Sequence, residues 1–279
     1  MTTRNQPPAA PAPRTTAAAT ARSVAYPVSP AELPEARLRS GSYTLEFART
    51  TEELDEILQL RFTVFNLELG EGLTESFVTG RDEDDLDRVF HHLLIRSRKT
   101  GQIVGTYRMQ TLAMARAHAG FYSAGEFDLA ALPAGVLENA VEIGRACVSR
   151  EHRNGRVLHL LWRGLATYLS WNDKRYLFGC CSLTSQDRAL GERVYHYLRR
   201  EGMVAEPEIM PLPDLDCRGA GEPAEDRPVD VPPLFQSYLN MGAKVCGPPA
   251  IDRLFKTIDF LVLFDKTQLN ARVFRSFFR

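Results

Sequence analysis

The chain has 279 residues, of which 44% are hydrophobic and 25% charged, and both values are typical of a folded domain with a sizeable core. Its formal net charge of -1 excludes a general attraction to nucleic acid or to an anionic membrane, so charge-based recognition must come from local patches. No run of about 18 apolar residues is present, and the five cysteines contain no CxxC pair, which argues against a disulfide framework or a zinc site.

Residues 1–40 are rich in Ala, Pro and Thr and show no apolar periodicity. Such a segment cannot bury enough surface to offset its ordering entropy, and we predict a disordered tail there. A folded domain is expected over residues 41–279. Within it, residues 202–235 are rich in Pro, Asp and Glu, which is typical of an insertion or lid rather than of core.

The apolar residues of this domain follow strand and helix periods in turn. Strands are predicted at residues 43–49, 91–98, 103–111, 141–148, 176–183 and 258–265. One helix is predicted to begin at Thr50, which has a capping-box spacing to Glu53, and two more at residues 156–171 and 186–200. This order predicts a single α/β domain with a mixed sheet flanked by helices.

Residues 142–156 contain the first sequence motif that indicates a function. A strand ending at Val148, a basic Gly-containing turn and a helix together resemble the acyl-carrier-binding motif of the GNAT superfamily. Glu142-x-x-Arg145, the block at 176–180 (Tyr-Leu-Phe-Gly-Cys) and the block at 239–253, with Gly-Pro-Pro at 247–249, resemble the ornithine-acyl carrier protein N-acyltransferases. The resemblance spans about residues 43–265 and implies a GNAT-like fold.

The same resemblance implies an activity. The implied reaction moves a fatty acyl group, with a 3-hydroxyacyl group as the expected kind, from acyl carrier protein to the α-amine of ornithine. This would be the first step of ornithine lipid synthesis. The thioester donor is a co-substrate, and no cofactor and no metal are implied.

Charged positions shared with related families, the N-acyl amino acid synthases and the acyl-homoserine lactone synthases, suggest the site residues. The expected catalytic residues are Glu142, Arg145 and Arg108. The positions expected to contact the substrate are Arg61, Phe65, Asp84, Asp87 and Lys244.

Amide formation from a thioester requires the α-ammonium to lose a proton, and the carboxylate of Glu142 could accept it directly or through water. The alternative for Glu142 is a buried ion pair with Arg145 or Arg108. Because Glu142 and Arg145 are three residues apart on one strand, they face opposite sides unless the strand is twisted or bulged. Acidic side chains at Asp84 and Asp87 would suit the side-chain ammonium of ornithine, whereas a solvated loop or a structural network is the competing interpretation.

A basic cluster surrounds the turn before the helix at 156–171. We expect it to bind the acidic acyl carrier protein, and the residues concerned are Arg150, Arg153, Asn154, Gly155 and Arg156. Arg156 and Leu158 stand where the GNAT turn usually has Gly, which favours the single phosphodiester of a carrier protein over the pyrophosphate of coenzyme A. An ordinary solvated helix face is the alternative.

Two other functions stay open from the sequence alone. One keeps the donor and changes the acceptor to another amino acid such as glycine or tyrosine, and the other is a non-catalytic acyl-binding module on the same fold. The expected partners are acyl carrier protein and an amino acid, not nucleic acid, and the expected location is the cytoplasm. Phe alternates with Arg over residues 271–279, which suits either peripheral contact with the inner membrane or docking on the core.

Overall fold

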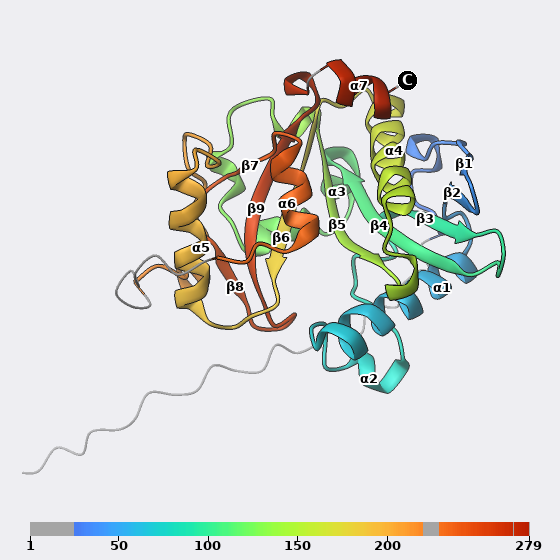
Figure 1. Ribbon diagram of the computed structural model, residues 1–279, viewed down its shortest axis with the longest axis horizontal. Coiled ribbons are helices and arrows are strands. Elements are labelled where there is room, and N and C mark those ends of the chain that lie inside the picture. Colours follow the sequence, from blue (N-terminus) through green and yellow to red (C-terminus); the bar gives the residue numbers. More distant parts are fainter. Residues whose placement is uncertain (1–24, 220–228, 270, 279) are drawn as a thin grey trace, which may run out of the picture.

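The computed structural model describes residues 25–219, 229–269 and 271–278. They form a nine-stranded sheet with helices on both faces, which confirms the predicted α/β architecture (Figure 1). The main strand order is β1 (Leu38–Ser40), β2 (Tyr43–Phe47), β3 (His91–Ser97), β4 (Ile103–Thr111), β5 (Ala140–Val148), β6 (Tyr176–Leu183), β9 (Thr257–Asp265) and β7 (Lys244–Val245). Strand β8 (Ala250–Asp252) also pairs with β9, and β5–β6 is parallel, whereas the other pairs of these nine strands are antiparallel.

The helices are α1 (Thr51–Arg61), α2 (Ser76–Thr79), α3 (Leu112–Ala117), α4 (Gly155–Trp171), α5 (Arg188–Arg200), α6 (Pro233–Asn240) and α7 (Ala271–Phe277). A π-helix, Phe62–Leu69, continues α1. The predicted cap of α1 is confirmed, because the Thr50 side chain accepts a hydrogen bond from the Glu53 amide at 3.2 Å. The Glu53 carboxylate in turn accepts from the Arg49 amide at 2.8 Å.

Helices α4, α5 and α6 cover one face of the sheet, called here the α4 face (Figure 1). Their apolar side chains pack on alternate strand residues, among them Leu93, Tyr107, Ile143, Phe260 and Val262. The other side, called the α1 face, is covered near β3 to β5 by α1 and the π-helix. Further along this face, Phe127 and Leu129 of the connection between α3 and β5 pack on Phe178 and Leu261.

The described parts of the predicted tail and of the predicted insertion are better packed than their composition indicates. Leu33 is buried and β1 pairs with β2, so residues 25–40 are ordered, while residues 1–24 lie outside the described part. Residues 202–219 make bridges to the sheet at Val204 and Asp216, and Ile209 and Cys217 are buried there. Isolated apolar residues anchor both segments, and isolated residues create no periodic signal. Residues 220–228 of the predicted insertion are not described.

Helix α7 bears on the predicted membrane contact. The ring of Phe277 lies 6.0 Å from that of Trp162 and 5.2 Å from that of His159, both on α4, and Phe278 also packs against the core. Phe274 remains 37% exposed. Two of the three aromatic side chains therefore dock on the protein. Among the described helices, none is long and apolar enough to span a bilayer.

The parallel strands β5 and β6 stay together for three residue pairs and then separate. Residues 140, 141 and 142 pair with residues 176, 177 and 178, although the two strands continue to Val148 and Leu183. Just beyond the last pair, a Cβ atom placed on Gly179 would lie 2.1 Å from the backbone oxygen of Ile143. Glycine at this position therefore allows the two backbones to approach at the point where the strands part.

A β-bulge in β5 lies beside this divergence. On β4, Thr106 and Arg108 are separated by one residue, whereas their partners Cys147 and Gly144 are separated by two. The extra residue places Arg145 in the left-handed region, with φ of 48°. The interpretation that Glu142 and Arg145 can share one side only on a bulged strand agrees with this geometry.

We expect Gly179→Ala to lower the free energy of unfolding by about 1–3 kcal/mol, because the added methyl group overlaps a backbone oxygen that cannot rotate away. Urea unfolding followed by circular dichroism measures the change. Gly144→Ala on β5 is the matched control, since its Cβ would come no closer than 3.9 Å to Arg108 Nε. Equal stability of the two variants would contradict this account of the strand divergence.

Candidate active site

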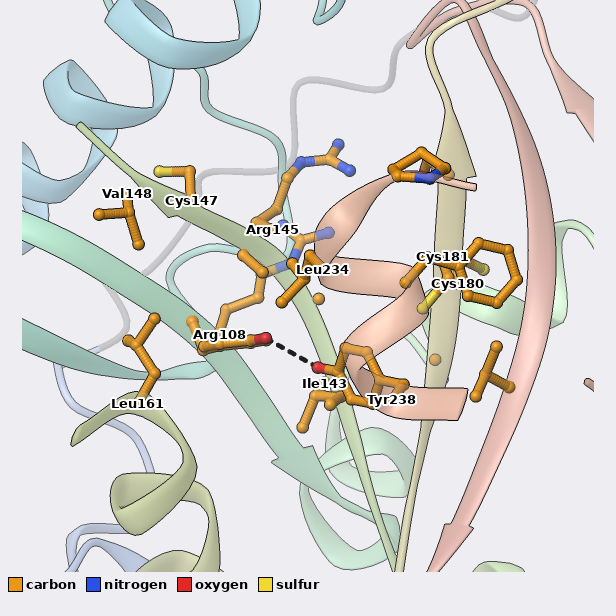
Figure 2. A pocket seen from close by; sticks show the side chains of 18 of the residues that line it. Arg108, Ile143, Arg145, Cys147, Val148, Leu161, Cys180, Cys181, Leu234 and Tyr238 are labelled. Atoms are coloured by element: carbon orange, nitrogen blue, oxygen red, sulfur yellow. Dashed lines mark hydrogen bonds between the residues drawn. The ribbon is translucent and has the colours of Figure 1, made fainter. Parts of the chain in front are cut away.

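A cavity of about 620 Å³ lies where β5 and β6 part, lined by residues of both strands (Figure 2). The α4-face wall is apolar and is formed by residues of α4 and α6, namely Leu158, Leu161, Leu234, Phe235 and Tyr238. The Tyr238 hydroxyl is held by a 2.8 Å hydrogen bond to the Tyr107 hydroxyl (Figure 2). The opposite wall is polar and includes Glu71, Tyr122, Glu142, Arg145 and Asp259. One cavity thus joins an apolar channel to a charged chamber.

A buried ion network lies on the α1 face next to this chamber. Its members are three arginines, Arg61, Arg108 and Arg145, and three aspartates, Asp82, Asp84 and Asp87. Arg61 binds Asp82 at 2.8 Å and also donates to Asp87, while Arg108 donates to Asp84 at 2.8 Å and to Asp87 at 3.0 Å. The equal numbers of positive and negative groups limit the cost of burying them.

Asp87 lies at the centre of this network. Burial alone would raise the pKa of its carboxyl group, but the charges of Arg61 and Arg108 hold that pKa well below its usual range. The carboxylate is therefore ionised throughout the neutral range. The oxygens of Asp84 and Asp87 are thus occupied by guanidinium groups, which is the structural network named above as the alternative to ammonium binding.

The bulge turns Arg145 toward the same chamber. Its guanidinium carbon lies 4.0 Å from the centre of the Phe255 ring and 5.2 Å from that of Tyr122. Nη2 donates to Asp84 at 3.3 Å, whereas Nε lies 3.6 Å from Asp82 Oδ2 and makes no hydrogen bond among the described residues. Arg145 is therefore held in place, and its Nε–H has no hydrogen bond within the described part of the chain.

Glu142 is 1% exposed and accepts four hydrogen bonds. One oxygen accepts from the amide and hydroxyl of Ser123, both at 2.7 Å, and the other accepts from Gln110 at 2.7 Å and from the Tyr122 amide at 3.0 Å. Four donors fill the lone-pair sites of a carboxylate. The arrangement favours a positioning role, in which Glu142 ties the loop at residues 122–123 to β5, over acceptance of a proton.

Phe65 and Lys244 have different surroundings. Phe65 of the π-helix lines the cavity and packs edge-to-face on Phe255, with ring centres 5.3 Å apart. Lys244 lies in β7 at the end of the strand order, is exposed, and donates to the Gly202 carbonyl at 2.7 Å. It does not line the cavity, so its predicted contact with the substrate lacks structural support.

The predicted carrier-binding residues gather at the start of α4. Asn154 caps the helix by accepting from the amides of Arg156 and Val157, and Arg153, Asn154 and Gly155 line the cavity mouth. Glu68 of the π-helix binds Arg153 in a bidentate pair and lies 3.7 Å from Arg150, which reduces the positive charge of the cluster. Arg156 is exposed on the first turn of the helix.

Several residues of this site were missed by the sequence analysis. They are Glu71, Asp82, Gln110, Tyr122, Ser123, Phe255 and Asp259, which come from loops and strands far apart in the chain. Asp82 belongs to the same acidic loop as Asp84 and could have been found there. The other six carry no local motif, and only the packing of the sheet brings them together.

Comparison with known proteins agrees with this geometry. Residues 60–163 match the family model described as an acetyltransferase (GNAT) domain. The chain is 31% identical over 247 residues to an L-ornithine N(alpha)-acyltransferase of Agrobacterium fabrum, covering 84% of each chain. It is 30% identical over 251 residues to a protein of the same name from Rhodobacter capsulatus, covering 85% of this chain and 95% of the other.

Among solved structures, the fold resembles that of FeeM, an N-acyl amino acid synthase from uncultured soil microbes. The TM-score is 0.50 at 11% sequence identity, and the match covers 83% of this chain and 96% of the other. The likeness is one of fold.

We expect Glu142→Gln to lower the free energy of unfolding by about 1–3 kcal/mol, because the amide nitrogen would face two donors and leave them unpaired. Chemical denaturation measures this loss. Glu138→Gln, an exposed substitution of the same kind just before β5, should leave stability unchanged. If Glu142→Gln were as stable as wild type, the four hydrogen bonds of Glu142 would not stabilise the fold.

Proposed function

We propose, because the chain belongs to the family of the L-ornithine N(alpha)-acyltransferases, that it transfers a fatty acyl group from the thioester of an acyl carrier protein to the α-amine of ornithine. Membership of this family makes the protein an acyltransferase. The observation that carries the finer proposal is the cavity at the β5–β6 divergence, with an apolar wall on one face and a charged wall on the other. A 3-hydroxyacyl chain is the proposed donor group, and the product would be the first intermediate of ornithine lipid synthesis.

The apolar wall suits the donor. Leu158, Leu161 and Phe235 offer a surface along which an acyl chain loses contact with water. Beyond Glu142, the edge of β5 that faces β6 has no strand partner among the residues that the structure describes. Its backbone groups are available to the amides of an extended pantetheine arm, in the manner of an added strand.

The start of α4 suits the phosphodiester of that arm. The positive end of the helix dipole attracts an anion, although Asn154 already binds the amides of Arg156 and Val157. Arg153 lies beside this helix end at the cavity mouth. The exposed Arg150 and Arg156 would then meet the acidic surface of the carrier protein.

The charged wall suits the amino acid. Arg145 is the proposed donor to the α-carboxylate, because its Nε makes no hydrogen bond with the described residues and its guanidinium is fixed between Tyr122 and Phe255. Arg108 and Arg61 act as positioning residues, since their guanidinium groups hold the aspartates that orient Arg145. Glu142 positions the loop that carries Tyr122.

The transfer itself needs orientation more than covalent help from the protein. The α-ammonium loses a proton to water or a carboxylate in the cavity, and the free amine nitrogen attacks the thioester carbonyl carbon. The new C–N bond forms, the C–S bond breaks, and the carrier thiol leaves with a proton. No other group is consumed.

The activity assay combines purified protein, 3-hydroxyacyl carrier protein and a panel of amino acids, with the N-acyl product and released carrier thiol measured by mass spectrometry. N-acyl ornithine is the expected product, with one carrier thiol released per amide formed. Glu142→Gln is expected to reduce turnover while donor binding persists.

Each other outcome of this assay identifies a different function. Product from glycine or tyrosine and none from ornithine would change the acceptor and keep the chemistry. Donor binding without any product would show that the protein is a non-catalytic acyl-binding module.

We also expect Arg156→Glu to raise the KM for the acyl carrier protein about tenfold at low salt, with the difference shrinking as ionic strength rises, because docking charges act through screened attraction. An acyl-pantetheine donor without the carrier protein should be used equally well by both forms. Arg116→Glu, an exposed charge reversal on α3, is the matched control. An unchanged KM in Arg156→Glu would remove this residue from the docking surface.

A further inference from the structure

A second group of buried acids lies beyond the ion network, in the wall of the same cavity. Glu126 follows the turn Tyr122–Gly125, Cys180 lies on β6, and Asp259 lies on β9. One side-chain oxygen or sulfur of each lies within 4.8 Å of the other two. Cys180 and Asp259 line the cavity directly, and Figure 2 shows Cys180 on β6 and Arg145 on β5, on facing walls.

The strand pairing explains why these residues meet. On the antiparallel β6–β9 ladder, Cys180 pairs with Leu261 and Ser182 with Asp259. Cys180 and Asp259 are therefore diagonal neighbours on one face of the sheet. This is the α1 face, to which Glu142 and the loop at 122–126 also belong.

Asp259 is a buried carboxylate with no salt-bridge partner in the described part of the chain, and the rise that burial causes in its pKa is partly offset by hydrogen bonding with the Ser182 side chain and by the charge of Arg145. It is 3% exposed, and its Oδ1 accepts no hydrogen bond from the described residues. Within the described part of the chain, no Lys, Arg or His forms a salt bridge with Asp259 or Glu126, whereas the aspartates at 82, 84 and 87 are each ion-paired with arginine. An unpaired buried carboxylate is costly, and a cation in contact with it would offset that cost.

The raised pKa values of the two acids agree with a site that binds a cation. Burial, followed by the negative charge of Asp252, raises the pKa of Asp259 to about 6. Burial, followed by the charges of Asp259 and Asp252, raises the pKa of Glu126 well above its usual range. Both acids therefore favour binding either a proton or another positive group.

The thiol beside them indicates which kind of cation fits. Cys180 Sγ donates a hydrogen bond to Glu126 Oε2 at 3.6 Å, and burial raises the pKa of this thiol well above its usual value. In the site without a bound ion it therefore keeps its proton. An ammonium group, with three N–H donors, can bind the free oxygen of Asp259 and an oxygen of Glu126.

We propose that Asp259 and Glu126 form the subsite that binds the side-chain ammonium of the acceptor amino acid, and so select a diamino acid such as ornithine. The inference rests on the proposed function, because it places the acceptor in this cavity. Arg145 on the facing wall would hold the α-carboxylate, and the α-amine would lie between the two groups, near the point where β5 and β6 part. Specificity then comes from a pair of acids outside the sequence block 82–87.

The test compares L-ornithine with L-norvaline, which has the same carbon chain without the side-chain ammonium. Wild type is expected to have a kcat/KM for ornithine at least about 30-fold higher than for norvaline, since leaving one partner of a buried charge pair unmatched has an effect of this size. Asp259→Asn should lose most of this preference through a higher KM for ornithine, and should use norvaline as well as wild type does. Glu126→Gln should act in the same direction.

Two controls make the result specific. Glu71→Gln removes a different buried acid that lines the cavity, and Asp173→Asn makes the same chemical change as Asp259→Asn in the turn after α4. Neither should alter the preference for ornithine. Unfolding curves of all variants establish that each is folded.

Binding of ornithine, norvaline and 1,4-diaminobutane by calorimetry separates the subsite from the reaction. Binding of ornithine and the diamine that is lost in Asp259→Asn would uphold the subsite even if another amine were acylated. Acylation of ornithine with an unchanged preference in Asp259→Asn would overturn the subsite and leave the reaction standing.

Three other results would also overturn it. The first is no preference for ornithine in either binding or turnover by wild type. The second is loss of the preference in Glu71→Gln instead of Asp259→Asn. The third is tight binding of Zn²⁺ that Cys180→Ser abolishes while the ornithine preference is unaffected by Asp259→Asn.

Discussion

The separation of β5 from β6 is the constraint on which the site depends. Two parallel strands that pair through residues 142 and 178 and then diverge leave a space between them, and beyond it one edge of β5 has no strand partner in the described part of the chain. Gly179 permits this because its hydrogen lies where a methyl group would meet the Ile143 carbonyl. The space passes from one face of the sheet to the other. A single cavity can therefore receive an apolar chain from the α4 face and a charged amino acid from the α1 face.

The ion network on the α1 face depends on this strand in turn. The bulge that accompanies the divergence brings Arg145 to the side that already carries Glu142 and Arg108. Three arginines and three aspartates then neutralise one another, which allows them to be buried and holds the guanidinium groups in fixed directions. Fixed donors cost little to reorganise when a ligand binds. As a consequence, the carboxylate oxygens of Asp84 and Asp87 are bound by arginine. The acids that remain available to a cation are Asp259 and Glu126.

Local chemistry is well represented in the sequence. Runs of apolar residues located β3, β4, β5 and β6, and the 3.6-residue period located α4 and α5 to within a few residues. The cap at Thr50 follows from side-chain chemistry within four residues. The resemblance at Glu142 and Arg145 pointed to the strand beside the cavity, and Arg61, Asp84, Asp87 and Arg108 indeed meet there. These features depend on neighbours in the chain or on a pattern that the chain carries in linear order.

The sequence by itself thus determined the element order, the α/β class and the charged residues that gather at the site. Only the tertiary structure decided how those residues share their hydrogen bonds. Gln110 of β4 and the loop at 122–123 donate the four hydrogen bonds that the Glu142 carboxylate accepts. Lys244 lies outside the cavity because β7 is at the end of the strand order. Asp259 and Glu126 meet only because β9 pairs with β6 after a long separation in the chain. Such contacts depend on strand order and register, which are properties of the whole sheet.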